Sequence, residues 1–200
     1  MQKEATLNRR MKDISEHAEI VEIILITIGI FLVPAILPQL LNIVFGAQSA
    51  IATNSQYIVG TIVNAALIVA GVNVKGWKKV VGLAIMPSMA AILSGMIFRS
   101  LSVFTIYMIP AIWLGNFTIM YLYRKLFVEK KINYVVASIV SISVKCSIIF
   151  AAFNLLTEIN VIPKALEILF MAFGANQVVT ATLGSIIAFA TLKLVYQRNK

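Results

Sequence analysis

The sequence is poor in cysteine, histidine and acidic residues. One cysteine, Cys146, and one histidine, His17, occur in 200 residues, so no internal disulfide and no Cys/His zinc site can form. Eight acidic residues stand against 17 basic ones, and no two carboxylates share an apolar run, so proton-relay chemistry has no candidate pair. We therefore expect no metal and no cofactor.

Motifs of common enzymes are missing as well. The sequence contains no H-E-x-x-H and no G-x-S-x-G. Gly71 and Gly76 have the glycine spacing of a phosphate-binding loop, but Trp77 and Lys78 follow them in place of the required Lys-Ser or Lys-Thr. The chain is expected not to be an enzyme and not to hydrolyse ATP.

The composition indicates an integral membrane protein. Hydrophobic residues make up 60% of the chain, charged residues 12%, and the mean hydropathy is +0.92, whereas roughly a quarter of the residues of soluble domains are charged. A chain of 200 residues has room for about six spans of roughly 20 residues and no separate soluble domain. The net charge of +9 lies in short clusters between apolar runs, which indicates topology and not nucleic-acid binding.

The apolar runs predict an all-α integral membrane fold, a six-transmembrane-helix bundle. Residues 1–19 form a polar cytoplasmic lead-in, and residues 20–196 form one transmembrane domain. Pro34 and Pro38 predict that the first helix kinks or stops there. Residues 39–56 are too apolar for a solvated loop, so we expect them to lie on or dip into the outer face. The expected spans are 20–37, 57–72, 80–98, 103–123, 132–153 and 175–196.

The basic residues predict the orientation. Fourteen of the 17 fall on the N-terminus, the second and fourth connections and the C-terminal tail, while Arg99 and Lys164 fall on the other side. Under the positive-inside rule both termini are cytoplasmic. We therefore predict a multi-pass protein of the cell (plasma) membrane that keeps its first span.

Lys145 is the residue that sets this sequence apart. It lies inside the apolar run Val135–Asn154, about eight residues or roughly 12 Å from the outer end of the helix. A charge at this depth is costly and is a functional candidate, and the side chain recovers only about half of that distance by snorkelling. An unpaired ammonium facing an outward cavity would suit an anionic ligand such as a carboxylate. Alternatively, Lys145 pairs with Glu158 or Glu167, or is neutral in a wet crevice.

The other polar residues of the bundle fall in the same outer half. Convergent groups of this kind, set against apolar walls, form ligand sites in membrane bundles. Each one alone could equally bond a neighbouring helix. The candidate substrate-binding residues are Lys145, Asn116, Trp113, Asn64, Asn176, Gln177, Thr180, Asn154, Tyr107 and Arg99, and Asn54 and Gln56 close the first connection.

The layout resembles the substrate-binding S component of energy-coupling factor (ECF) vitamin transporters. The resemblance rests on the length, the six spans, the uncharged first connection, the stretch Pro110-Ala-Ile-Trp-Leu-Gly-Asn116 and the pair Asn176-Gln177. It implies that the outer half binds a vitamin or related micronutrient, with the first connection, including Asn54 and Gln56, as a lid. It also implies docking on a transmembrane coupling subunit driven by two ATPases. The first span departs from the family's Ala-x-x-x-Ala docking face, since its small residues are Thr27, Gly29 and Ala35.

Two other function classes are open to such a bundle. A non-transporting membrane subunit or assembly factor would use its polar residues to join helices, which predicts full pairing of Lys145 and Asn116 and no outer cavity. A small secondary transporter would show inverted halves and an intramembrane acid, and the sequence has neither.

Overall fold

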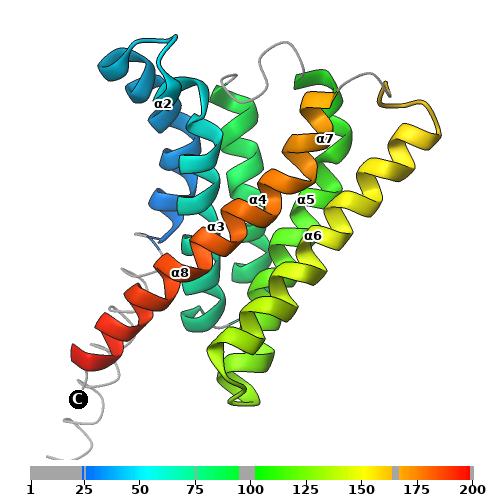
Figure 1. The fold of residues 1–200 in the computed structure, drawn as a ribbon. Helices are drawn as coiled ribbons and strands as arrows, with labels where there is room; N and C mark the ends of the chain where they lie inside the picture. The colour runs from blue at the N-terminus through cyan, green and yellow to red at the C-terminus, as the bar shows by residue number, and fades with distance from the viewer. Residues whose placement is uncertain (1–23, 25, 75, 95–101, 164–166, 199–200) are drawn as a thin grey trace, which may run out of the picture.

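The described part of the chain is helical. The computed structural model describes residues 24, 26–74, 76–94, 102–163 and 167–198, and these contain no strand (Figure 1). Five of the helices are long and apolar enough to cross a membrane, as a multi-pass membrane protein requires. They are Ile26–Phe45, Ser55–Asn73, Phe104–Glu129, Tyr134–Glu158 and Leu169–Leu194.

Within the described residues, eight elements follow the first helix, Ile26–Phe45. They are α2 (Ala50–Thr53), α3 (Ser55–Asn73), α4 (Trp77–Ser94), α5 (Ser102–Tyr123), the π-helix η2 (Arg124–Glu129), α6 (Tyr134–Glu158), α7 (Glu167–Phe173) and α8 (Ala175–Arg198).

The number of spans rests on α4. This helix covers most of the predicted span 80–98, but it begins with the charged pair Lys78 and Lys79 and is not among the five candidate spans. Residues 95–98 of that predicted span, and the lead-in 1–19, lie outside the described residues. Six spans and cytoplasmic termini therefore stay predictions.

The first helix does not stop at its prolines. It continues through Pro34 and Pro38, both buried, to Phe45. A proline removes one backbone hydrogen bond, but packing against neighbouring helices lets membrane helices tolerate the loss. The first connection is therefore shorter than expected: it turns at Gly46, where φ is +82°, and then forms α2, whose Ala52 N–H is capped by Ser49 Oγ at 3.1 Å.

A second unexpected helix, α7, precedes α8. One residue, Gly174, separates the two helices, and α8 then crosses the face of the bundle to the opposite end (Figure 1). A Cβ on Gly174 would lie 2.7 Å from the Phe170 carbonyl oxygen, so the break suits glycine alone. The bend places the first turn of α8 above the middle of the bundle.

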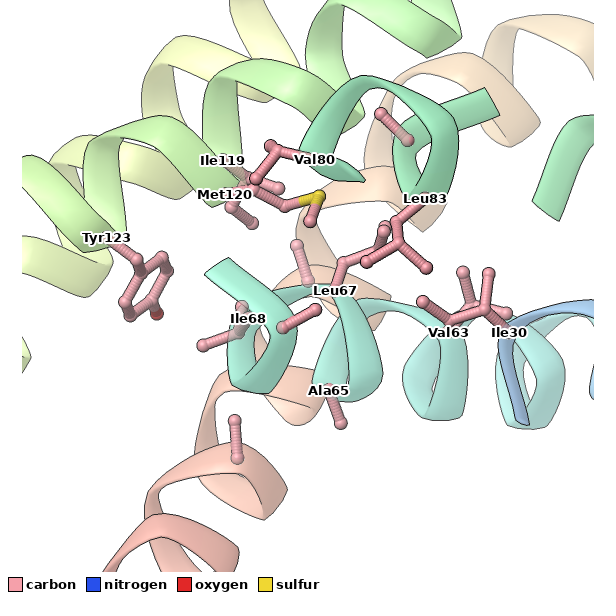
Figure 2. Packing of buried hydrophobic residues seen from close by; sticks show 14 of the residues in the cluster. Ile30, Val63, Ala65, Leu67, Ile68, Val80, Leu83, Ile119, Met120 and Tyr123 are labelled. Carbon is pink, nitrogen blue, oxygen red and sulfur yellow. The ribbon is translucent and has the colours of Figure 1, made fainter. Parts of the chain in front are cut away.

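The centre of the bundle is α3, which packs against α8, α5 and α4. Figure 2 shows Leu67 and Ile68 of α3 packed among side chains of the other helices, such as Leu83 of α4 and Met120 of α5. Glycines bring the backbones close together. A Cβ on Gly71 would lie 2.7 Å from Met120 backbone atoms, and one on Gly184 would lie 2.7 Å from Asn64 Cβ.

The end of the bundle that carries η2 is tied by side chains to backbone groups. The Arg124 guanidinium donates to the carbonyl oxygens of Gly71, Val72 and Val74, at 3.0, 3.2 and 2.5 Å. These carbonyl oxygens lie at the C-terminal end of α3 and have no hydrogen-bond partner within the helix. A cation there supplies the missing donors and also interacts favourably with the helix dipole. Arg124 thus joins the start of η2 to the end of α3.

A closed polar cluster lies at the same end. The Tyr123 hydroxyl is within hydrogen-bond distance of Ser138 Oγ (2.8 Å) and Ser185 Oγ (2.9 Å). The Tyr134 hydroxyl donates to the Ser185 carbonyl oxygen at 2.7 Å, and its ring packs on Tyr123 and Phe189. These groups bond one another across α5, α6 and α8.

The glycine contact between α8 and α3 predicts a large effect from one methyl group. Gly184→Ala places a Cβ against Asn64 Cβ and, at 2.9 Å, against the Ala65 nitrogen and the Thr61 oxygen. We expect a loss of about 1–3 kcal/mol, seen as a lower apparent melting temperature of the protein in detergent. Gly82→Ala, whose Cβ meets nothing within 4 Å, is the matched control and is expected to be neutral or stabilising. Equal melting temperatures for the two variants would contradict the close packing.

The Arg124 contacts predict a second difference between neighbouring residues. Arg124→Gln leaves three carbonyl oxygens at the end of α3 without their charged donor, and hydrogen bonds to charged groups contribute about 1.5–3 kcal/mol each. Lys125→Gln removes only an exposed pair with Glu129, so its effect should be small. Thermal unfolding of both variants checks this, and an Arg124 variant as stable as the Lys125 variant would rule out the role assigned to Arg124.

Candidate functional site

A cavity of about 320 Å³ lies at the end of the bundle that carries α2 and α7. Its volume falls in the range of small-molecule sites, which is about 300–1,000 Å³. The first helix, α3, α4, α5, α6, α7 and the N-terminal part of α8 contribute residues to it. The described lining residues are Pro34, Gln56, Val59, Gly60, Val63, Asn64, Pro87, Ser88, Ala91, Ile92, Thr105, Ile106, Ile109, Ile112, Asn116, Lys145, Ala172, Asn176, Gln177 and Thr180.

The structure brings most of the predicted site residues together at this cavity. Those that line it are Lys145, Asn116, Asn64, Asn176, Gln177, Thr180 and Gln56. Four others are not among the lining residues: Trp113, Tyr107, Asn154 and Asn54. Arg99 lies outside the described residues. Whether any of these side chains binds a substrate stays a prediction.

Lys145 forms the floor of the cavity. Its side chain is 2% exposed, and its ammonium donates to Asn64 Oδ1 at 2.5 Å and to Asn116 Oδ1 at 3.0 Å. These acceptors come from α3 and α5, so one charge on α6 joins three helices. An ammonium has three protons, and the described residues accept two of them.

The two asparagine amides are oriented by neighbours on further helices. The Asn64 amide nitrogen donates to the Gly60 carbonyl oxygen at 2.9 Å and to Thr180 Oγ1, on α8, at 3.3 Å. The Asn116 amide nitrogen donates to the Ala84 carbonyl oxygen, on α4, at 3.1 Å. With both amide nitrogens engaged elsewhere, both oxygens point to Lys145.

Small residues make room for this arrangement. A Cβ on Gly115 would lie 3.3 Å from Lys145 Cγ and 3.1 Å from Ile149, so the lysine chain passes over a residue without a side chain. A Cβ on Gly60 would lie 2.9 Å from Thr180, which lets that residue approach α3. The pair Gly115-Asn116 thus provides both the space for the lysine and an acceptor for its ammonium.

A carboxylate partner for Lys145 was the main alternative. Glu158 is exposed at the end of the same helix, 13 residues or about 20 Å along the axis. Glu167 is not among the residues whose side chains are described. Among the side chains that are described, Lys145 has no ion pair, and amide oxygens alone accept from it.

The wall formed by α3 and α8 is polar. The Tyr57 hydroxyl donates to Asn176 Oδ1 at 2.7 Å, Thr180 Oγ1 donates to the Asn176 carbonyl oxygen at 2.8 Å, and the Gln177 amide nitrogen donates to the Ala172 carbonyl oxygen at 3.2 Å. The Asn176 amide nitrogen and Gln177 Oε1 have no bond to another described group. This wall therefore retains a donor and an acceptor beside the cavity.

The wall formed by α4 and α5 is mostly apolar apart from Ser88 and Thr105, and sequence reasoning missed it. Its residues recur at helical spacing, three or four apart, which places them on one face of each helix. Counting back one helical turn at a time from Asn116 would have found the α5 face, and counting back one turn from Asn64 would have found Gly60. The missed apolar residues of this wall are Pro87, Ala91, Ile92, Ile106, Ile109 and Ile112.

Apart from Lys145, the described basic residues lie at the end of the bundle opposite to the cavity. Lys78 and Lys79 begin α4, Lys130 and Lys131 follow η2, and Lys193 is near the end of α8, whereas Gln56 and Asn176 begin their helices at the other end. The positive-inside rule predicts that the basic end faces the cytoplasm, and this orientation stays a prediction.

The predicted residues away from the cavity have other surroundings. Tyr107, Asn154 and Asn54 are exposed. Trp113 Nε1 is buried and, among the described residues, has no hydrogen-bond partner. Tyr107 lies on the side of α5 opposite to Asn116, whereas Trp113 lies one turn from both Ile109 and Asn116 but is not among the lining residues.

Nothing in the comparisons with known proteins identifies this site. No protein-family model matches the chain, and no curated protein or solved structure is similar to it at the significance threshold applied. Within the described residues, no three His, Cys, Asp or Glu side chains are placed to hold a metal ion. The interpretation of the cavity therefore rests on its own residues.

The pairing of Lys145 with Asn116 predicts a coupling that a double-mutant cycle can measure. Asn116→Leu removes one of two acceptors of a buried charge, and we expect a loss of about 1.5–3 kcal/mol. In a Lys145→Met background there is no charge to satisfy, so the same change should cost clearly less. Unfolding of the wild type, both single variants and the double variant in detergent checks this.

Asn154→Leu, which changes an exposed asparagine on α6, is the control for that cycle and should cost the same in both backgrounds. Equal costs for Asn116→Leu with and without Lys145 would show that the two side chains do not act together.

Proposed function

We propose that this chain is a high-affinity substrate-binding membrane subunit of an ECF-type importer in the cell membrane. It captures a vitamin or related small micronutrient in an outward-facing pocket and passes it to a coupling subunit driven by separate ATPases. The observation that carries the proposal is the cavity of about 320 Å³ with the buried Lys145 ammonium at its floor.

The lining supports small-molecule binding. Sites for small molecules are concave and mostly apolar, with a few polar groups that fix the orientation of the ligand. This cavity combines isoleucines of α4 and α5 with amides of α3 and α8 around one charge. A buried ionisable group in a membrane bundle is a functional candidate by default, and here it adjoins empty space.

The direction of transport follows from the charge distribution. A pocket at the end away from the lysines would face outward, as capture from the surroundings requires. The sequence contains no phosphate-binding loop, so ATP would have to be used by other subunits. The resemblance of the layout to S components supports a coupling subunit with two ATPases as those partners.

The second candidate is a non-transporting membrane subunit or assembly factor. Two hydrogen bonds from Lys145 and the bond between Tyr57 and Asn176 favour it, because they join α3 to α5, α6 and α8. Polar residues that only hold helices together have no need of a cavity beside them. The two candidates therefore differ in one measurable property, the binding of a small molecule.

Binding to the purified protein tests the proposal. We expect a screen of vitamins and their precursors, by native mass spectrometry and thermal shift, to find a ligand that stabilises the wild type. Lys145→Ala should lose that ligand, and Ile109→Trp, which fills the cavity, should weaken it strongly. Lys193→Ala removes an exposed lysine at the other end of the bundle and should bind as the wild type does.

The opposite outcome would favour the second candidate. If no compound binds the wild type, and Ile109→Trp is as stable as Lys193→Ala while Lys145→Ala is clearly less stable, then the cavity serves no ligand and the lysine joins helices.

A further inference from the structure

We propose that the ligand of this cavity is a singly charged carboxylate whose body has an apolar face and an amide-type edge with both N–H and C=O groups. This inference rests on the proposed function, because it names the class of substrate for the same site. It is argued from the charge at the floor and from the difference between the two walls.

The floor selects the sign of the charge. Of the described residues that line the cavity, Lys145 is the only ionisable one, and its described partners are neutral amide oxygens. A buried cation without a counter-ion is costly, and an anion beside it removes that cost. A cationic ligand would add a second positive charge to the same apolar surroundings. The third proton of the ammonium is the donor available to the ligand.

The floor also limits the amount of charge. One ammonium compensates one negative charge, so a carboxylate leaves the site neutral. A phosphate monoester would bring nearly two negative charges to a cavity whose other described groups are amides, hydroxyls and hydrocarbon. The excess charge would then be desolvated without compensation. A carboxylate therefore fits the described lining better than a phosphate does.

The walls select the body of the ligand. Ile92, Ile106 and Ile109 give the wall formed by α4 and α5 an apolar surface that suits an apolar face of the ligand, beside the smaller side chains of Ser88 and Thr105. On the opposite wall the Asn176 amide nitrogen can donate and Gln177 Oε1 can accept, because their other polar atoms are already bonded. The same helix turn thus offers the cavity one donor and one acceptor, which suits a ligand that carries both a C=O and an N–H.

The depth of each polar side chain in the cavity determines where the carboxylate and the amide-type edge of the ligand would lie. Thr180 bonds Asn64, which bonds Lys145, so Thr180 marks the level of the floor on α8. Asn176 lies one helical turn, about 5.4 Å, closer to the mouth. The carboxylate would lie deep, and the amide-type edge would lie about a turn above it.

A matched series of probes tests the charge. The probes are 6-phenylhexanoate, 6-phenylhexan-1-ol, 6-phenylhexylamine and 6-phenylhexylphosphonate, titrated into the full-length protein in a mild detergent. We expect the carboxylate to bind the wild type about tenfold or more tightly than the alcohol, as one bond to a charged group allows. The amine should bind more weakly than the alcohol, and the phosphonate no more tightly than the carboxylate.

Lys145→Met separates this preference from uptake by the micelle. The ratio of carboxylate to alcohol affinity should fall to about one or below in this variant and stay unchanged in Lys193→Met. If Lys145→Met does not fold, the ratios in the wild type and Lys193→Met decide alone. An alcohol or amine that matches the carboxylate, a phosphonate that exceeds it, or no binding of any probe would overturn the inference.

A second pair of probes tests the edge. 4-Benzamidobutyrate and 6-phenylhexanoate have the same number of atoms between ring and carboxylate, and only the first has an amide. We expect the amide to bind more tightly to the wild type and to lose this advantage in Gln177→Leu. If 4-benzamidobutyrate still binds more tightly than 6-phenylhexanoate in Gln177→Leu, or does not bind more tightly in the wild type, the proposed amide-type edge is wrong.

The two proposals can fail separately. If a vitamin binds and is lost in Ile109→Trp, while the probe series shows no preference for the carboxylate, the proposed function stands and this inference falls. If neither vitamins nor probes bind, both fall.

Discussion

The rest of the site depends on one requirement, that a buried ammonium far from any end of its helix be given acceptors. Lys145 meets it through Asn64 and Asn116, which places α6, α3 and α5 in fixed register. The asparagines in turn need partners for their amide nitrogens, which α8 supplies through Thr180 and α4 through Ala84. Five helices therefore meet around one charge, and the contacts that hold the bundle also shape the floor of the cavity.

The close approach of the helices serves the same arrangement. Without a hydrophobic driving force between helices in lipid, packing and interhelical hydrogen bonds have to hold the bundle. Gly184 brings α8 against α3 at the level of Asn64, and Gly115 leaves space for the lysine chain on α5. Small residues near the charge thus allow hydrogen bonds that a larger side chain at either position would lengthen. Stability and site geometry cannot be changed independently here.

The sequence predicted the level of the polar residues along their helices better than the helix face on which they lie. The position of Lys145 in an apolar run, and of Asn64, Asn116 and Asn176 along theirs, predicted that they lie at related levels, which the shared cavity agrees with. Tyr107 lies at a suitable level but on the side of α5 opposite to Asn116, because the face that a helix presents depends on its neighbours. Trp113 lies one turn from Asn116 and still does not line the cavity. Pro34 and Pro38 did not stop the first helix, and no sequence pattern predicted α7 as a separate helix. Both depend on tertiary packing, which overrides local propensity.

The two polar clusters of the bundle differ in a way that bears on function. Around Tyr123 and Tyr134, hydroxyls and a carbonyl oxygen bond one another, so this cluster joins helices at the basic end. Around Lys145 the bonds leave one ammonium proton and, on the wall above, a donor and an acceptor beside empty space. Polar groups in a bilayer are costly unless satisfied. The cluster around Tyr123 therefore holds helices together, whereas the groups around Lys145 keep hydrogen-bonding capacity beside the cavity.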